Sequence, residues 1–356
     1  MRFGRREILS GGTALMAGAA LGGTTTAAAS ASPAAKDAPA FDVMPFVHPE
    51  LRAAVAKMGA MAAVTITPAM LPMARSTMSG TAPKPEAAPA IRELTIPGPR
   101  DNPSLRIYVI NEGDKGKPRA AILNMHGGGF ILGRAADELP ALQKTARELD
   151  CVIVTVEYRL APETPFPGSL EDSYAALRWL HANAPSLGAD PGGITVMGAS
   201  AGGGLAAMLA IAARDRGEVP IVFQALHFPM LDDRTGSTVQ RPRQQGAVMW
   251  TPASNRFGWT ALLGAPAGSD AAPRGAVPAR ESDLAGLPPT VIGVGSIDLF
   301  YEENVEYARR LAAAGVPVEM AIAPGAYHGF VMVEDAPVTQ RYLQHFNAAL
   351  ARGLTA

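Results

Sequence analysis

The sequence predicts an α/β protein in which one mostly parallel, eight-stranded sheet is covered by helices on both faces. Two observations support this prediction. The chain has 356 residues, of which 48% are hydrophobic and 18% charged, so it carries enough apolar side chains for one large core. From about residue 91, short apolar runs alternate with longer amphipathic stretches, the order expected for strands and helices of a parallel sheet.

The predicted elements follow in order along the chain. The strand candidates are residues 91–96, 105–110, 120–124, 152–156, 194–197, 222–227, 290–294 and 318–323. The helix candidates, where apolar side chains recur at three- and four-residue spacing, are residues 136–149, 170–183, 202–214, 302–314 and 338–350. We therefore expect one α/β core made from two stretches of the chain, residues 91–232 and residues 288–356.

The charge balance argues against a nucleic-acid binder. There are 31 basic and 32 acidic residues, and the formal net charge of −1 offers no positive excess to hold a phosphate backbone or anionic lipid. The single cysteine, Cys151, has no partner for an internal disulfide and precedes an apolar strand candidate. We expect it to be a buried, packed thiol.

Residues 1–31 predict a twin-arginine export signal. Arg5 and Arg6 precede an apolar stretch over residues 8–22 that is too short and too glycine-rich to span a bilayer stably, and small residues follow at 27–32. Such a signal would place the mature protein in the periplasm or outside the cell. An uncleaved anchor or a disordered tail is the alternative. No other segment reaches the ~18 unbroken apolar residues of a membrane helix, so we expect no stable membrane insertion.

Two segments outside the predicted sheet are expected to form a cap. Residues 32–90 are rich in Ala, Pro and Met and include a helical stretch over residues 49–55, which predicts a linker followed by a small cap element. Residues 233–287 lack the strand–helix alternation and carry Trp250 and Trp259. An insertion of this length is usually functional, for example as a lid. The alternative is a surface excursion whose tryptophans merely pack.

The sequence Gly-Ala-Ser-Ala-Gly at residues 198–202 contains the candidate nucleophile, Ser200. It follows a strand candidate and precedes a helix candidate, which is the strand–turn–helix context that the G-x-S-x-G nucleophile elbow requires. Small residues on both sides of the serine let the turn tighten until the hydroxyl projects from its tip.

A serine nucleophile needs a base that takes its proton and a carboxylate that holds the base. In such a sheet these groups lie at the carboxyl ends of strands, in the chain order serine, acid, histidine. His328 follows the last strand candidate, and Asp298 follows the one before it. Glu302 and Glu303 are rival acids, although they coincide with a predicted helix start. Four other histidines fit the position of the base less well: His48, His181, His227 and His345.

The sequence His-Gly-Gly-Gly-Phe at residues 126–130 predicts an oxyanion loop. Consecutive glycines after a strand let successive N–H groups point at one spot, and such donors are worth ~3–4 kcal/mol to a tetrahedral oxyanion. We expect the donors to be the N–H groups of Gly127, Gly128 and Ala201. The alternative is a bare glycine turn.

Together these motifs resemble the hormone-sensitive-lipase family of α/β-hydrolases. The resemblance rests on residues 126–130, on Glu-Tyr-Arg-Leu-Ala-Pro-Glu at 157–163, on Gly-Ala-Ser-Ala-Gly-Gly at 198–203, and on Leu-Pro-Pro-Thr at 287–290 leading to Asp298. It covers nearly everything from about residue 91 to the C-terminus. Two positions depart from the family pattern: Ala199 stands where members usually carry an acidic residue, and Leu-Phe-Tyr at 299–301 where many read Pro-Leu-Arg.

The resemblance implies an α/β-hydrolase fold with a helical cap and a serine carboxylesterase that acts on short- to medium-chain esters through an acyl-enzyme on Ser200, without a cofactor. Phe130, Trp250 and Trp259 are the expected walls of the substrate pocket. A lactone, amide or acetylated-sugar hydrolase with the same triad is an alternative, as is a non-catalytic ligand-binding member of the fold. No metal or nucleotide site is expected, since no H-E-x-x-H motif, Cys/His cluster or glycine-rich phosphate loop occurs.

Overall fold

The structure is a computed structural model that describes residues 41–79, 84–99 and 103–355. Every helix and strand named below lies in one compact unit, Asp42–Ala356. The predicted export signal at residues 1–31 and the first part of the predicted linker, residues 32–40, lie outside the described residues.

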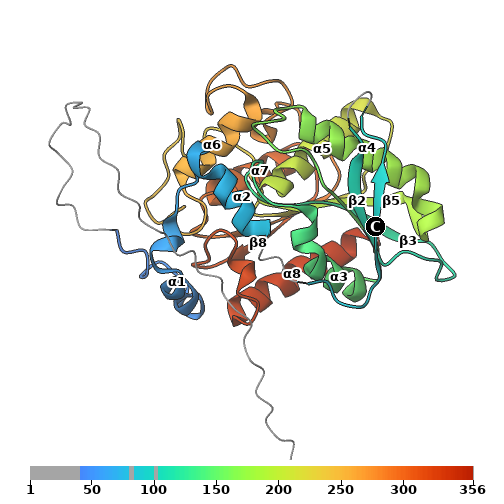
Figure 1. Ribbon diagram of the computed structural model, residues 1–356, viewed down its shortest axis with the longest axis horizontal. Coiled ribbons are helices and arrows are strands. Elements are labelled where there is room, and N and C mark those ends of the chain that lie inside the picture. Colours follow the sequence, from blue (N-terminus) through green and yellow to red (C-terminus); the bar gives the residue numbers. More distant parts are fainter. Residues whose placement is uncertain (1–40, 80–83, 100–102, 356) are drawn as a thin grey trace, which may run out of the picture. The chain divides into compact units, whose positions relative to one another are not determined.

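This unit is built on a sheet flanked by helices (Figure 1). The sheet has eight strands in the order β1-β2-β4-β3-β5-β6-β7-β8. The strands are β1 (Ile91–Ile96), β2 (Leu105–Ile110), β3 (Arg119–Met125), β4 (Val152–Val156), β5 (Ala189–Ala199), β6 (Phe223–His227), β7 (Thr290–Gly295) and β8 (Val318–Ala323). β2 pairs antiparallel with both β1 and β4, whereas all other pairs are parallel. The predicted class, a mostly parallel sheet of eight strands, is confirmed.

The predicted start of β5 is wrong, because the strand begins at Ala189 rather than at residue 194. Ala189 pairs with Arg119 of β3, and the register between the two strands then shifts before regular pairing resumes. The intervening Pro-Gly-Gly at residues 191–193 is typical of a turn. Only the pairing with β3 shows that the segment belongs to the strand.

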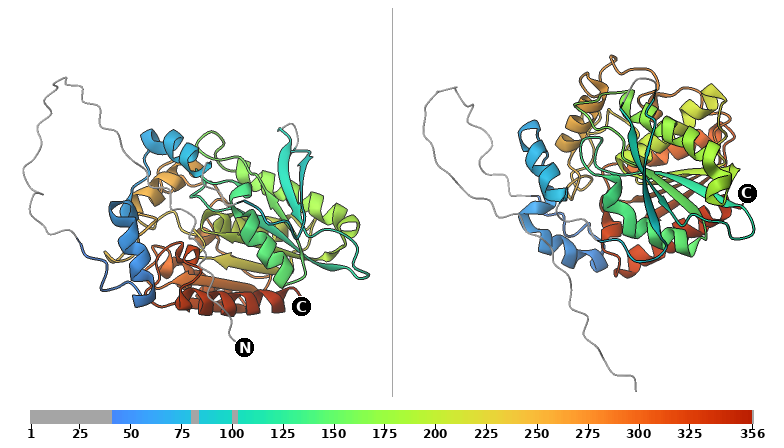
Figure 2. Two further views of the ribbon diagram at one scale, coloured as in Figure 1. Left: turned by 60° about the horizontal axis from the view of Figure 1, so that its bottom comes forward. Right: turned by 45° about the vertical axis from the view of Figure 1, so that its right-hand side comes forward.

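Helices cover both faces of the sheet, because side chains along each buried strand alternate between two apolar clusters (Figure 2). Leu123 of β3 belongs to the cluster that contains side chains of α4 (Gly168–Asn183), α5 (Ala201–Arg216) and α7 (Tyr301–Ala313). Ile122 belongs to the cluster of α3 (Leu139–Glu148) and α8 (Pro337–Gly353). Cys151 is buried in this second cluster, and burial raises the pKa of its thiol to about 12.

Both predicted cap segments contain helices, and they contact each other. The N-terminal segment forms η1 (Pro49–Leu51), α1 (Arg52–Met58), η2 (Gly59–Ala63), η3 (Pro68–Met70) and α2 (Leu71–Ser79), and the insertion forms α6 (Pro252–Leu263) and η6 (Pro278–Arg280). Three further 3-10 turns are η4 (Ala135–Glu138), η5 (Ala184–Leu187) and η7 (Phe330–Met332). Met249 N–H donates to the carbonyl of Ala62 at 2.6 Å, and the hydroxyls of Thr65 and Thr251 lie 3.1 Å apart. The N-terminal segment therefore runs along the insertion.

Taken singly, no helix in residues 41–79, 84–99 and 103–355 combines the length and apolarity needed to cross a bilayer. Two parts of the N-terminal segment, Pro49–Ala63 and Pro68–Thr77, meet that criterion as a pair, across a bend of 109°.

Candidate active site

Ser200 occupies the sharp turn between β5 and α5. Its backbone has φ +58° and ψ −121°, a conformation that is strained for a residue with a side chain and that concentrates at functional sites. The turn is close to β3, since a Cβ atom on Gly202 would lie 2.0 Å from the carbonyl oxygen of Met125. Ser200 N–H donates to the carbonyl of His227 at the end of β6, at 2.9 Å. The chain therefore forms the predicted strand–turn–helix elbow with the serine at its tip.

The structure brings Ser200, Asp298 and His328 together from the carboxyl ends of β5, β7 and β8. Nε2 of His328 lies 2.9 Å from Oγ of Ser200, and Nδ1 lies 2.9 Å from Oδ2 of Asp298. A carboxylate can only accept hydrogen bonds, so Nδ1 carries the imidazole proton and Nε2 is left to accept the serine proton. Asp298 is fully buried, while Ser200 and His328 are each 8% exposed. The relay is thus shielded from water except at its reacting end.

Two aromatic rings that the sequence analysis missed hold the imidazole of His328. The rings of Phe228 and Phe300 meet it edge-on, with centroids 5.1 and 5.0 Å away. Phe300 N–H also donates to Oδ1 of Asp298 at 2.9 Å, which fixes the carboxylate. Both residues follow strands β6 and β7 closely, and that position is the only signal in the sequence that could have indicated them.

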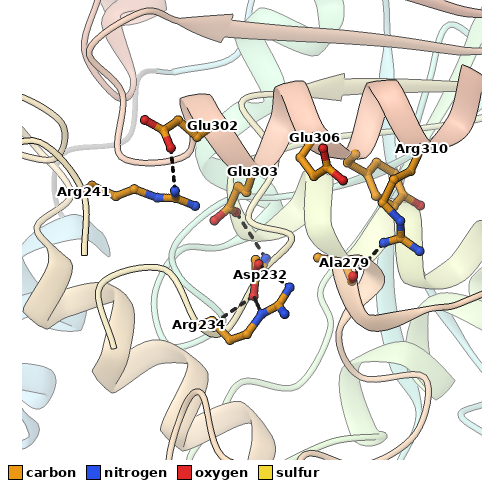
Figure 3. Close-up of a pocket in the computed structure, with 9 residues that line it drawn as sticks. Asp232, Arg234, Arg241, Ala279, Glu302, Glu303, Glu306 and Arg310 are labelled. Carbon is orange, nitrogen blue, oxygen red and sulfur yellow. Dashed lines mark hydrogen bonds and ion pairs between the residues drawn. The ribbon is translucent and has the colours of Figure 1, made fainter. Parts of the chain in front are cut away.

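The rival acids Glu302 and Glu303 have other partners. Both line a separate pocket of about 200 Å³ between the start of α7 and the residues after β6, and no triad residue lines it (Figure 3). Glu302 pairs with Arg241 at 2.7 Å, and Glu303 accepts the N–H of Leu231 at 2.7 Å. Burial, reinforced by the nearby Asp232 carboxylate, raises the pKa of Glu303 well above its usual range. Asp298 is therefore the acid that faces the base.

Three of the other histidines, His126, His227 and His345, also have structural contacts of their own. His227 stacks on Phe346 with centroids 3.6 Å apart, and its Nδ1 lies 2.9 Å from the hydroxyl of Tyr342. Burial lowers the pKa of His227 to about 3 and that of His126, in the oxyanion loop, to about 4. The largely exposed His345 pairs with an acidic side chain of β8. No imidazole of these three forms a hydrogen bond with the Ser200 hydroxyl among the described residues, whereas Nε2 of His328 does.

The oxyanion loop differs from the sequence prediction at Gly127. The N–H of Gly127 donates to Oε1 of Glu138 at 3.0 Å. One N–H group already committed to a carboxylate is not free for an oxyanion, so the prediction of Gly127 as a donor is wrong. The N–H groups of Gly128 and Gly129 have no acceptor among the described residues, and Ala201 supplies the first N–H of α5. Gly129, which the sequence analysis left out, therefore joins Gly128 and Ala201 as a candidate donor.

Glu138 is a partly buried acceptor that no feature of the sequence singled out. Besides the Gly127 N–H, its carboxyl accepts the side-chain amide of Asn124 at 2.9 Å. Burial raises the pKa of Glu138 above its usual range, although both hydrogen bonds oppose that rise. On the other side of the loop, the Tyr158 hydroxyl donates to the carbonyl of His126 at 2.7 Å, and the two rings stack. The loop is held from both sides.

Of the three predicted pocket walls, only Trp250 lies against the oxyanion loop. A Cβ atom on Gly129 would lie 2.2 Å from the Trp250 ring, whose Nε1 donates to Asn255 at 3.1 Å. Phe130 and Trp259 are 1% and 0% exposed and pack on each other with centroids 5.1 Å apart. Because both rings are shielded from solvent, the prediction that they line the substrate pocket is wrong. The two rings belong to the core between the sheet and α6.

No group of three or more His, Cys, Asp and Glu side chains in the described part of the chain is arranged to hold a metal ion. The geometry around Ser200 instead offers a nucleophile, a base, an acid and unpaired backbone donors. That combination performs acyl transfer.

Comparison with known proteins agrees with this geometry. Residues 122–332 match a family model described as the alpha/beta hydrolase fold. Esterase LipI of Mycobacterium tuberculosis is 36% identical over 258 residues, which are 70% of this chain and 78% of LipI. Carboxylesterase NlhH of the same organism is 36% identical over 221 residues, 59% of this chain and 66% of NlhH. A solved bacterial heroin esterase superimposes with a TM-score of 0.80 at 37% identity, covering 88% of this chain and all of that one.

Proposed function

This chain belongs to the hormone-sensitive-lipase family of α/β-hydrolases and is a carboxylic ester hydrolase, and we propose that Ser200, Asp298 and His328 carry its chemistry. The observation that supports this assignment is the continuous chain of hydrogen bonds from the serine hydroxyl through the imidazole to the buried carboxylate. A serine hydroxyl is a weak nucleophile without such a base, and the base requires the carboxylate to hold its tautomer.

The reaction proceeds in two halves. His328 Nε2 takes the proton of Ser200 as Oγ attacks the ester carbonyl carbon, and the imidazolium then protonates the departing alcohol. Asp298 stabilises the imidazolium without accepting its proton. In the second half, water gives a proton to His328 and attacks the acyl carbon, and His328 then returns that proton to Ser200 Oγ as its bond to the acyl carbon breaks, which releases the carboxylic acid and restores the serine.

The tetrahedral oxyanion of each half-reaction is met by the N–H groups of Gly128, Gly129 and Ala201. The backbone of Gly128 has φ +121° and that of Gly129 has φ +62°, and both values favour glycine. A Cβ atom on Gly128 would lie 2.1 Å from the carbonyl oxygen of Leu132. These donors are therefore preorganised by the loop itself, the condition under which such groups stabilise developing charge most strongly.

We expect the preferred substrates to be esters with short to medium acyl chains. Ser200 and His328 are only 8% exposed, and Trp250 of the insertion lies directly against Gly129. A bounded pocket gains ~0.8 kcal/mol per buried methylene until it is full, after which further carbons clash or stay in water. With p-nitrophenyl esters of increasing length, kcat/KM should peak at about four to six acyl carbons and then fall.

The Trp250→Ala variant tests whether this ring limits the acyl chain. Removing the indole next to Gly129 should move the optimum to longer chains, whereas Trp179→Ala, on α4 and outside the cap, should leave the optimum in place.

The rates of the wild type are also compared below and above the solubility limit of each ester. A profile that keeps rising at long chains, or a jump in rate at an oil–water interface, would indicate a true lipase and contradict this substrate class.

We also propose that residues 1–31 direct export by the twin-arginine route, on the support of Arg5, Arg6 and the short apolar stretch that follows them. The double variant Arg5→Lys with Arg6→Lys should then retain the full-length chain in the cytoplasm, while the wild type is shortened and recovered outside it. Cell fractionation with N-terminal sequencing distinguishes the two. An unshortened wild-type chain in the cytosol would refute the proposal.

A further inference from the structure

One side chain, Arg75, ties the N-terminal cap helix α2 to the oxyanion loop. Its Nε donates to the carbonyl of Ile131 at 2.8 Å, and its Nη2 donates to the carbonyl of Ala161 at 2.8 Å. Nη1 and Nη2 also donate to the two carboxylate oxygens of Glu163, at 2.8 and 2.9 Å. A planar guanidinium can serve several acceptors at once in this way. Arg75 therefore joins three segments that are distant in the sequence.

Both carbonyl groups belong to the network that shapes the oxyanion turn. Ile131 N–H donates back to the carbonyl of Gly128 at 3.1 Å, which closes the turn. Ala161 N–H donates to the carbonyl of Phe130 at 3.0 Å, which links the turn to the neighbouring loop. Because Arg75 binds the carbonyls of Ile131 and Ala161 together, it completes a ring of hydrogen bonds around the turn.

The carbonyl contacts, rather than the ion pair, account for this role. Glu163 has a side chain that is 62% exposed, and exposed ion pairs contribute little because water screens them. The two hydrogen bonds to carbonyl groups are partly buried. Helix α2 is also held by the buried side chains of Leu71 and Ala74, so the helix keeps apolar contacts with the core when Arg75 is shortened.

We propose that Arg75 is a positioning residue for ester hydrolysis, which fixes the oxyanion turn from the cap so that the Gly128 and Gly129 N–H groups point at the reacting carbonyl. This inference rests on the proposed function of the Ser200 site. The oxyanion exists in the transition state and not in the bound substrate. Misaligned donors therefore reduce the stabilisation of the transition state more than they reduce the affinity for the substrate. Loss of Arg75 therefore lowers kcat and leaves KM nearly unchanged.

The test compares Arg75→Ala with the wild-type full chain on p-nitrophenyl butyrate. We expect kcat to fall about tenfold, less than the ~10²–10³ seen when an oxyanion donor is removed outright. The inhibition constant of a trifluoromethyl ketone, whose serine adduct carries an oxyanion, should rise by the same factor. Added ethylguanidinium should restore kcat, and ethylammonium should not, because only the former has the planar fork. Arg75→Lys should fall between alanine and wild type.

Arg147→Ala is the matched control. Arg147 also joins a segment outside the sheet to a helix, donating to Glu86 at 2.7 Å and to the carbonyl of Ala88 at 3.1 Å, but it does not touch the oxyanion loop. The kcat of Arg147→Ala should equal that of the wild type. Melting temperatures check that Arg75→Ala and Arg147→Ala both fold. If Arg75→Ala does not fold, the kcat, the KM and the inhibition constant of Arg75→Lys are compared with those of the wild type instead.

Three results would overturn the inference: an unchanged kcat in the folded Arg75 variant, a loss confined to KM, or a loss that ethylguanidinium does not repair. Failure of the wild type to hydrolyse any ester would refute the proposed function instead, so the two failures are distinct.

Discussion

Replacing Ser200 with alanine is expected to lower kcat by about 10⁴–10⁶-fold, equivalent to about 5–8 kcal/mol of transition-state stabilisation. The variant keeps the elbow, whose Gly202 contact with β3 does not involve the serine side chain, but it has no atom to form the acyl-enzyme. The oxyanion donors and the cap remain, so the residual rate should come from binding and polarisation of the ester alone.

The measurement is steady-state hydrolysis of p-nitrophenyl butyrate together with burst kinetics, because an acyl-enzyme releases its first alcohol before turnover. Ser186→Ala is the control, since this exposed serine donates only to the carbonyl of Asn183, at 2.7 Å in η5. Its activity should be that of the wild type. A Ser200→Ala enzyme within tenfold of the wild-type rate would show that another group is the nucleophile.

Replacing His328 with alanine is expected to cost about 10⁴-fold or more in kcat, because removal of one triad member disables the proton relay as a unit. In the wild type, His328 must be unprotonated to accept the serine proton at 2.9 Å, so kcat/KM should rise as that imidazole loses its proton and then level off. The variant should lose that rise along with most of the activity.

His227 provides the control for this pH dependence. Burial lowers the pKa of His227 to about 3, so its imidazole remains neutral throughout the range in which the activity rises. His227→Gln should therefore keep the shape of the wild-type pH profile, even if loss of the stack on Phe346 lowers stability. A profile that changes in His227→Gln and persists in His328→Ala would reverse the assignment of the base.

Much of the fold could be predicted because its signals are local. Strands β4 and β7 are mostly apolar and buried from end to end, β3 is buried at every residue but one, and the predicted positions of all three need little correction. The Ser200 turn is also local, since its strand, glycines and helix lie within one continuous stretch. β5 shows the limit of such signals: its first residues look like a turn and become strand only through Ala189 pairing with Arg119.

The details of the site could not be predicted in the same way. The three glycines after β3 indicate an oxyanion loop, but they do not show which N–H groups remain unpaired. Gly127 is excluded by Glu138, a residue eleven positions later whose carboxyl turns back to accept its N–H. Likewise, Trp250 and Trp259 look equivalent in the sequence, yet one lies against Gly129 and the other is sealed in the core.

The sequence by itself determined the α/β class and the chemical types in the site, because periodicity, turn chemistry and strand-end position are properties of neighbouring residues. Only the tertiary structure decided which donors are free, which tryptophan lies against the oxyanion loop and which residue of α2 reaches the oxyanion turn. Those outcomes depend on contacts such as that of Arg75 with Ile131, between segments 56 positions apart. No local pattern encodes such a pair, since its geometry exists only after the sheet has brought the segments together.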